Sequence, residues 1–107
     1  MTGIDFAPGK IVFNDMETLS DVPLIEQMDL LEEDLLQVEF PRTLLLDVGW
    51  YGEYPTGQFI VYILLNQNWS NPVWRRETSS TADLREILKD AVQYIGNRLR
   101  ILLLNEI

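Results

Sequence analysis

The chain has 107 residues, so we expect a single domain over residues 1–107, because domains usually run to about 100 to 150 residues. Apolar types make up 47% and charged types 23% of the chain, a composition that excludes disordered and fibrous proteins. The chain contains no Cys and no His. This excludes disulfides, zinc sites of the Cys/His type, and catalysis by a Cys nucleophile or an imidazole base.

The net charge of -9 is distributed unevenly along the chain. Residues 1–40 carry ten acidic residues and one basic residue, whereas residues 41–107 carry seven of each. Such an asymmetry repels nucleic acids and anionic membranes and attracts basic surfaces. It therefore favours a basic protein as partner, although an acidic surface that only keeps the protein soluble is the alternative.

The N-terminus lacks the basic start and apolar stretch of a secretory signal. The longest apolar run is the seven residues Phe59–Leu65, whereas a bilayer span needs about 18 to 20. We therefore expect no membrane segment and a cytoplasmic location.

The acidic first part of the chain predicts a short strand and a helix. The strand is expected at Lys10–Phe13, after the turn signal Pro8-Gly9. The helix is expected over Val22–Leu31, with Ser20 or Asp21 as its N-cap. Four apolar residues of this acidic helix follow a period of 3.6 and predict its buried face: Leu24, Ile25, Met28 and Leu31.

The middle of the chain predicts an antiparallel meander. Alternating or continuous apolar residues indicate the following strands: Asp34–Phe40, Thr43–Tyr51, Gln58–Asn66 and Val73–Thr78. Tyr54–Gly57 supplies a turn. The charged strand Val73–Thr78 is typical of a sheet edge.

A long helix follows the meander. Ser80–Asp83 is close to a capping box, and the residues after it carry one apolar stripe. Gly96-Asn97 is either the end of this helix or an interior position, so residues 98–104 are open between helix and strand. The expected fold is α+β: a three- to four-stranded antiparallel meander packed against a long C-terminal helix, with an acidic N-terminal helix.

No motif for catalysis or cofactor binding is found. The glycines do not form GxGxxG, and Gly9-Lys10 is followed by Ile11 where a P-loop needs Ser or Thr. The acidic run Glu32-Glu33-Asp34 lacks the spacing of a calcium loop. We expect no catalytic residue, cofactor or metal, and a pair of carboxylates acting as acid and base is the enzyme class that the composition most easily leaves open.

The residues expected to bind a partner come from two groups. The first is acidic and lies on the predicted helix and directly after it, and the second is largely aromatic and lies near the strand ends. Large aromatic residues anchor interfaces or close the end of a core. The candidates are Glu26, Asp29, Glu32, Glu33, Asp34, Trp50, Glu53, Tyr54 and Trp69.

Three stretches, Leu45–Tyr51, Gly57–Phe59 and Asn68–Pro72, precede the C-terminal helix in a pattern that resembles small bacterial immunity proteins. These proteins belong to polymorphic-toxin and contact-dependent growth inhibition systems. The likeness covers Leu44 to Ile95, about half of the chain. It implies a cytoplasmic protein that binds and neutralises the C-terminal toxin domain of a cognate effector, commonly a nuclease.

The expected mechanism is steric and electrostatic blockade, because a nuclease surface attracts phosphate and is therefore basic. One alternative is an acidic chaperone or adaptor for a basic or amphipathic protein segment. A small carboxylate-dependent enzyme is the third reading. The sequence leaves open the toxin's identity, inhibition at its active site or at an exosite, and the oligomeric state.

Overall fold

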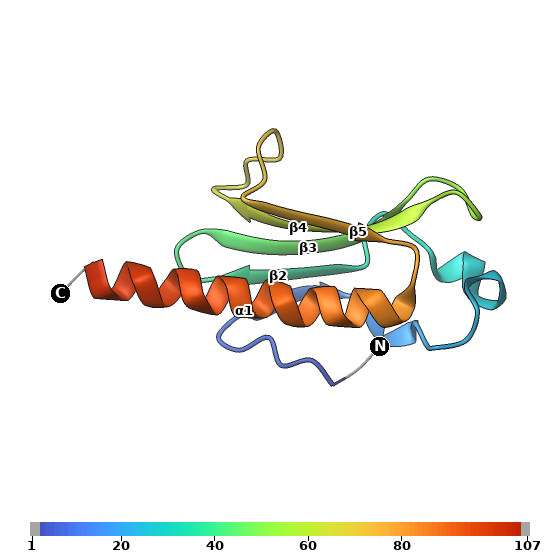
Figure 1. Cartoon of the computed structure of the whole chain (residues 1–107), viewed down its shortest axis with the longest axis horizontal. Helices are drawn as coiled ribbons and strands as arrows, with labels where there is room; N and C mark the ends of the chain where they lie inside the picture. Colours follow the sequence, from blue (N-terminus) through green and yellow to red (C-terminus); the bar gives the residue numbers. More distant parts are fainter. Residues whose placement is uncertain (1–2, 106–107) are drawn as a thin grey trace.

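Five antiparallel strands and one long helix form an α+β fold in the computed structural model, which describes residues 3–105 (Figure 1). The strands are β1 (Lys10–Asn14), β2 (Leu36–Phe40), β3 (Leu44–Tyr51), β4 (Gln58–Leu65) and β5 (Trp74–Thr78). They lie in the order β1-β2-β3-β4-β5, and each pairs antiparallel with the next. The expected meander is confirmed, with one strand more than the three to four predicted, because the N-terminal segment also pairs.

The core lies between one face of this sheet and the helix α1 (Thr81–Asn105). Alternate residues of the three central strands point toward the helix, as a period of two requires. Those buried in this way are Leu36, Val38, Phe40, Leu44, Leu46, Val48, Trp50, Phe59, Val61 and Ile63. The helix contributes Leu84, Leu88, Ala91 and Ile95 at helical spacing.

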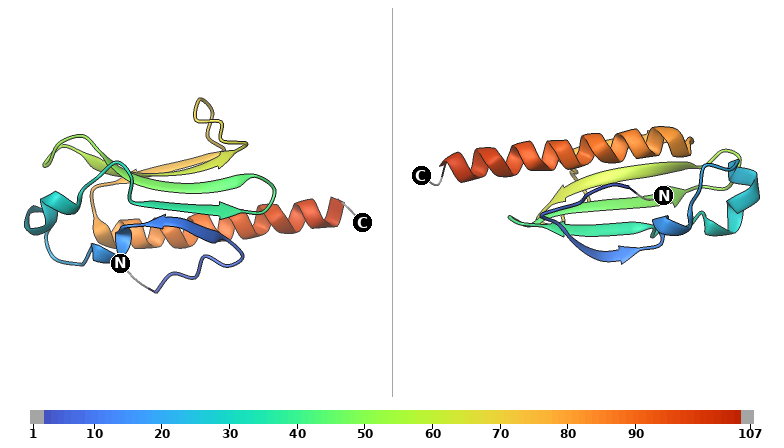
Figure 2. Two further views of the ribbon diagram at one scale, coloured as in Figure 1. Left: turned by 180° about the vertical axis from the view of Figure 1, so that it is seen from behind. Right: turned by 90° about the horizontal axis from the view of Figure 1, so that it is seen from below.

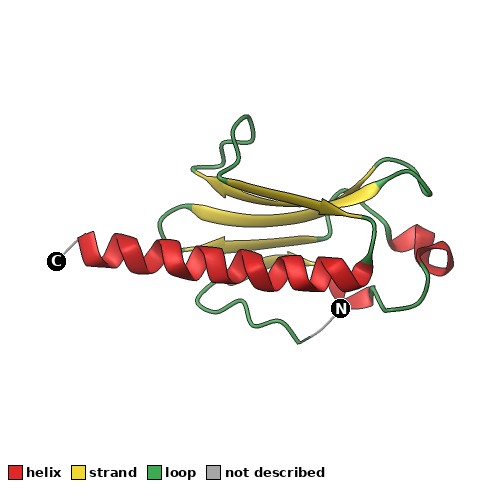
Figure 3. Ribbon diagram, viewed as in Figure 1, coloured by secondary structure: helices red, strands yellow, loops and turns green. Residues whose placement is uncertain are grey.

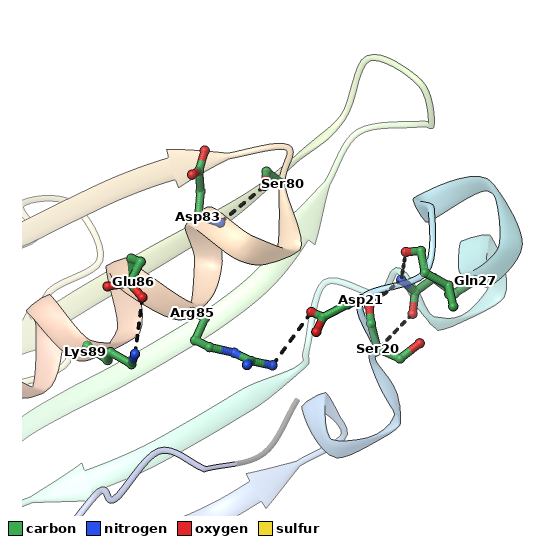
Figure 4. Close-up of polar contacts among 9 residues, drawn as sticks. Ser20, Asp21, Gln27, Ser80, Asp83, Arg85, Glu86 and Lys89 are labelled. Carbon is green, nitrogen blue, oxygen red and sulfur yellow. Dashed lines mark hydrogen bonds and ion pairs between the residues drawn. The ribbon is translucent and has the colours of Figure 1, made fainter.

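Helix α1 begins where the sequence predicts and ends later than its glycine suggested. The backbone N–H of Asp83 donates to Ser80 Oγ at 3.2 Å, which caps the first turn (Figure 4). The helix continues through the exposed Gly96, so residues 98–104 are helical and not a strand. At 1.5 Å per residue it is about 37 Å long, and its last turns extend past the sheet (Figure 1).

The predicted acidic helix over Val22–Leu31 is wrong in kind. The segment forms a short 3-10 helix, η2 (Leu24–Leu30), interrupted at Gln27 (φ -138°, ψ 30°), and a second one, η1 (Met16–Thr18), precedes it. Neither Ser20 nor Asp21 caps it, because Pro23 holds the N-cap position without a side-chain hydrogen bond. A short segment without a cap depends on tertiary contacts for its shape.

The other face of the sheet carries no helix of the described chain (Figure 2). The acidic residues 32–34 reach this helix-free face because β2 begins at Leu36 and not at Asp34. Trp50 N donates to Glu32 O at 2.7 Å and Leu35 N donates to Val48 O at 3.0 Å. Between these two bonds the chain bends outward, and the carbonyl of Glu33 lies over Gly49.

Substitution of Gly49 tests this packing. A Cβ at position 49 would meet the Glu33 carbonyl, so we expect Gly49→Ala to lower the free energy of unfolding by about 1 to 3 kcal/mol. Gly96→Ala is the matched control, because that Cβ meets nothing within 4 Å and should raise the free energy of unfolding by about 1 kcal/mol. Urea denaturation measures both, and equal effects of the two changes would contradict the packing of residues 32–35 on β3.

Candidate partner-binding surface

Two stretches that are far apart in sequence meet at one end of the molecule. The η2 helix and the turn between β3 and β4 both lie at the end opposite the C-terminus (Figures 1 and 3). A shallow groove of about 330 Å³ joins them. Its lining combines residues of both stretches with one core residue: Met28, Leu31, Trp50, Gly52, Glu53 and Tyr54. The groove therefore joins η2, which carries the predicted acids Glu26 and Asp29, to the predicted turn contacts Glu53 and Tyr54. The other predicted acids, residues 32–34, do not line it and lie toward the helix-free face.

Apolar side chains are exposed among the acids at this end. Ile25 is 62% exposed and Met28 is 46% exposed, although the sequence pattern placed both on a buried face. We call this surface the acidic end and define it by these members: Val22, Ile25, Glu26, Met28, Asp29, Glu53 and Tyr54. All are exposed except Tyr54, which is half-buried against the core.

The side chain of Gln27 explains this inversion of the pattern. Gln27 is 3% exposed and bonds to the preceding loop (Figure 4). Its Oε1 accepts from Ser20 N at 3.1 Å, and its Nε2 donates to Ser20 O and to Val22 O, both at 3.0 Å. Because the polar residue occupies the inward position, its apolar neighbours Ile25 and Met28 face solvent.

The charge of the acidic end is opposed by few cations nearby. Arg85 of α1 lies 3.7 Å from Asp21 and ties the loop to the helix (Figure 4). Several other basic residues belong to the far end, where the β2–β3 turn holds Arg42 and the end of α1 holds Arg98 and Arg100 (Figure 1). The molecule is elongated, 51 × 29 × 21 Å, so these three cations lie far along its long axis from the acidic end.

Not all predicted contact residues share this surface. Trp50 is buried against Phe59, with ring centroids 4.9 Å apart, and its Nε1 donates to Gly52 O at 2.8 Å. Trp69 lies in the β4–β5 loop at the far end of β4 (Figure 1). An eight-residue strand spans about 25 Å, so Trp69 is distant from the acidic end. Its ring instead contacts Tyr62, with centroids 5.5 Å apart.

The helix-free face holds a buried carboxylate that the sequence analysis did not single out. Asp47 is 2% exposed, and its Oδ2 accepts a hydrogen bond of 2.8 Å from Gln37 Nε2. Burial raises the pKa of Asp47 above its ordinary value of 3.8, the bond from Gln37 acts against this, and the charge of Asp34 adds to the increase. The sequence feature that could have identified Asp47 is its position as the one acidic residue within the otherwise largely apolar β3.

Tyrosine rings lie beside this carboxylate. Tyr51 and Tyr62 meet edge to face, with centroids 6.4 Å apart. Burial and then the charge of Asp47 are the main causes that raise the pKa of Tyr51 to about 12. The guanidinium carbon of Arg75 lies 5.8 Å from the centre of the Tyr62 ring. The helix-free face is therefore aromatic as well as acidic.

Comparisons with protein-family models, with curated proteins and with solved structures find no match. Within residues 3–105, no helix has the length and apolar character to cross a membrane. In the same part of the chain, no group of three or more acidic side chains is placed to hold a metal ion. The arrangement of exposed acids around apolar side chains is one that can bind a basic protein surface.

Loss of the Gln27 side chain should loosen the acidic end. Gln27→Ala removes three hydrogen bonds from a buried site, so we expect the free energy of unfolding to fall by about 2 kcal/mol. Amide exchange at Ser20 should also accelerate. Gln93→Ala on the exposed side of α1 is the control, with an expected change within about 0.5 kcal/mol. If both variants unfold alike, Gln27 does not hold the segment.

Asp47 should make stability depend on pH. The native carboxyl binds its proton more tightly than the unfolded one, so the free energy of unfolding falls as pH rises from 3.8 through the raised pKa. That loss persists at neutral pH. Asp47→Asn keeps an acceptor for Gln37 without the charge, so we expect it to be more stable than the native chain at pH 7 and to lose this advantage below pH 3.8.

Urea denaturation at a series of pH values measures this difference. Glu39→Gln removes an exposed carboxylate from the adjacent strand and serves as the control. A variant Asp47→Asn that is less stable than the native chain at pH 7 would show that the buried charge is compensated within the fold.

Proposed function

We propose that the chain is an immunity-type neutraliser, which binds a basic toxin domain, most simply a nuclease, through the acidic end and blocks its activity. The observation that carries the proposal is the exposure of Ile25 and Met28 between the carboxylates of Glu26, Asp29 and Glu53. Apolar side chains at the centre of an interface supply much of the affinity, and surrounding charges select the partner.

Electrostatics support a basic partner. The acids of the acidic end are exposed, and a one-sided field can raise association rates by about 10 to 1,000-fold at low salt. Nucleases attract phosphate, so the surface around their active site is basic. A carboxylate surface that docks there competes directly with the nucleic acid substrate.

The division of the chain also supports this proposal. The stretch that resembles immunity proteins, Leu44–Ile95, forms β3, β4, β5 and much of α1. The acidic end, apart from its turn residues, belongs to the chain before that stretch. A sheet and helix that hold an acidic segment outside the resembling stretch are suited to recognition of one particular partner.

Capture with matched variants tests the proposal. The tagged chain is incubated with lysate of its source organism at low and high salt, beside Glu26→Lys/Asp29→Lys and the control Glu86→Lys/Asp90→Lys, which changes the charge equally on exposed positions of α1. We expect one folded basic domain that the native chain and the control retain and the first variant loses. Coexpression with the native chain should then suppress that domain's toxicity.

Two other results would contradict the proposal. Retention of many unfolded or amphipathic segments would favour an acidic chaperone or adaptor. Equal retention by both double variants would exclude the acidic end as the binding surface.

Kinetics should separate the two kinds of contact. Glu26→Lys/Asp29→Lys removes steering, so we expect association with the captured domain to slow about tenfold at low salt and to depend less on salt. Ile25→Ser/Met28→Ser removes apolar area without changing charge, so we expect faster dissociation and an unchanged association rate. Stopped-flow or biosensor measurements report both, and an association rate insensitive to the charge change would exclude steering.

A further inference from the structure

A second pocket lies on the helix-free face, away from the groove of the acidic end. It has a volume of about 270 Å³ and is lined by Phe13 of β1, by Asp34, which precedes β2, and by Gln37 of β2. Phe13 pairs with Gln37 across the two strands, and its side chain is 38% exposed. An exposed aromatic ring, a carboxylate and an amide therefore line one pocket.

The orientation of the Gln37 amide is fixed by Asp47, its cross-strand neighbour on β3. An ionised carboxylate can only accept hydrogen bonds, so Gln37 must present its Nε2 to Asp47, as it does at 2.8 Å. The amide oxygen Oε1 is then left as an acceptor on the other side of the group. The pocket thus offers acceptors, from Asp34 and Gln37, to an incoming donor.

The negative charge at this pocket is uncompensated within the described residues. No ion pair there joins Glu33, Asp34 or Asp47 to an Arg or a Lys. Asp47 is 2% exposed, and among the described residues only Gln37 donates a hydrogen bond to its side chain. Asp47 does not line the pocket itself, but its charge interacts with that of Asp34, which does, so the pocket favours a cation.

We propose that this pocket binds the guanidinium group of an arginine on the partner protein, with Asp34 and Gln37 Oε1 accepting its N–H groups and the Phe13 ring packing against its plane. The negative charge of Asp47, the cross-strand neighbour of Gln37, strengthens the attraction. The inference rests on the proposed function, because a basic partner provides the arginine. It extends the contact from the acidic end onto the helix-free face.

The chemistry of the pocket favours arginine over other cations. A guanidinium is planar, presents several donors at once and stacks on aromatic rings, whereas an ammonium is a compact and strongly hydrated charge. Among the described residues, no group of three or more acidic side chains is arranged to hold a metal ion. The combination of an aromatic ring, a carboxylate and an oriented amide therefore matches a guanidinium.

Titration of the isolated chain with Nα-acetyl-L-arginine methylamide tests the proposal by NMR at low ionic strength. We expect chemical-shift changes at the side-chain amide of Gln37 and at the backbone of Phe13 and Asp34, with a dissociation constant on the order of 1 to 10 mM. The corresponding citrulline compound has the same shape without the charge and should produce no shift. The corresponding lysine compound should bind more weakly.

Two variants decide which groups bind the probe. Asp34→Asn should weaken binding by about three- to tenfold, whereas Glu39→Gln, which removes an exposed carboxylate on β2 outside the pocket, should change it by less than about twofold. Asp47→Asn should also weaken binding. Urea denaturation of the same variant, which we expect to be at least as stable as the native chain at pH 7, excludes unfolding as the cause of that loss.

Three outcomes would overturn the proposal. They are no shift at these residues at probe concentrations up to about 50 mM, equal shifts with the citrulline compound, or binding of the probe by Asp34→Asn as tight as by the native chain. This test is independent of the acidic end, because it uses the isolated chain and a small probe. Failure here leaves the capture experiment unaffected, and failure of the capture experiment leaves the pocket measurable.

Discussion

The surface of this protein depends on the hydrogen bonds of one buried amide. Gln27 fills an inward position and bonds to Ser20 and Val22, which holds η2 in a short, interrupted 3-10 form. A continuous amphipathic helix would have buried the apolar residues and left the acids on a smooth, charged surface. Because the buried Gln27 amide makes its hydrogen bonds within the protein, Ile25 and Met28 are exposed next to the acids. The result is a surface on which exposed apolar side chains lie next to carboxylates.

A second constraint carries the acidic segment onto the sheet. Gly49 has no side chain, so the backbone of Glu33 lies directly over β3, and the bonds from Trp50 N and Leu35 N fix the segment on either side. This path places Asp34 within electrostatic range of Asp47. One stretch of chain therefore links the acidic end to the helix-free face, and a partner that covers both buries more area than the end alone provides.

The fold follows from patterns that are local and regular. The apolar alternation in β2 to β4 and the apolar stripe after Ser80 predict the strands and the start of the helix, because the strand and helix periods depend on neighbours in sequence. The candidate partner-binding surface could not be predicted from such local patterns. Four apolar residues over Val22–Leu31 fit a helical face, but tertiary bonds of Gln27 decided the conformation, and the burial of Trp50 or Asp47 depends on segments distant in sequence.

The buried carboxylate of Asp47 lowers the stability of the fold at neutral pH. A charge buried in a strand opposes folding, and an apolar or amide side chain at that position would remove the cost. Stability alone therefore does not account for a carboxylate there. Its position beside Gln37 on the adjacent strand orients the amide of Gln37 and adds negative potential where the acidic segment crosses the sheet. If the proposed function holds, a cationic partner at this pocket would compensate the charge of Asp47, and binding would then also stabilise the folded state.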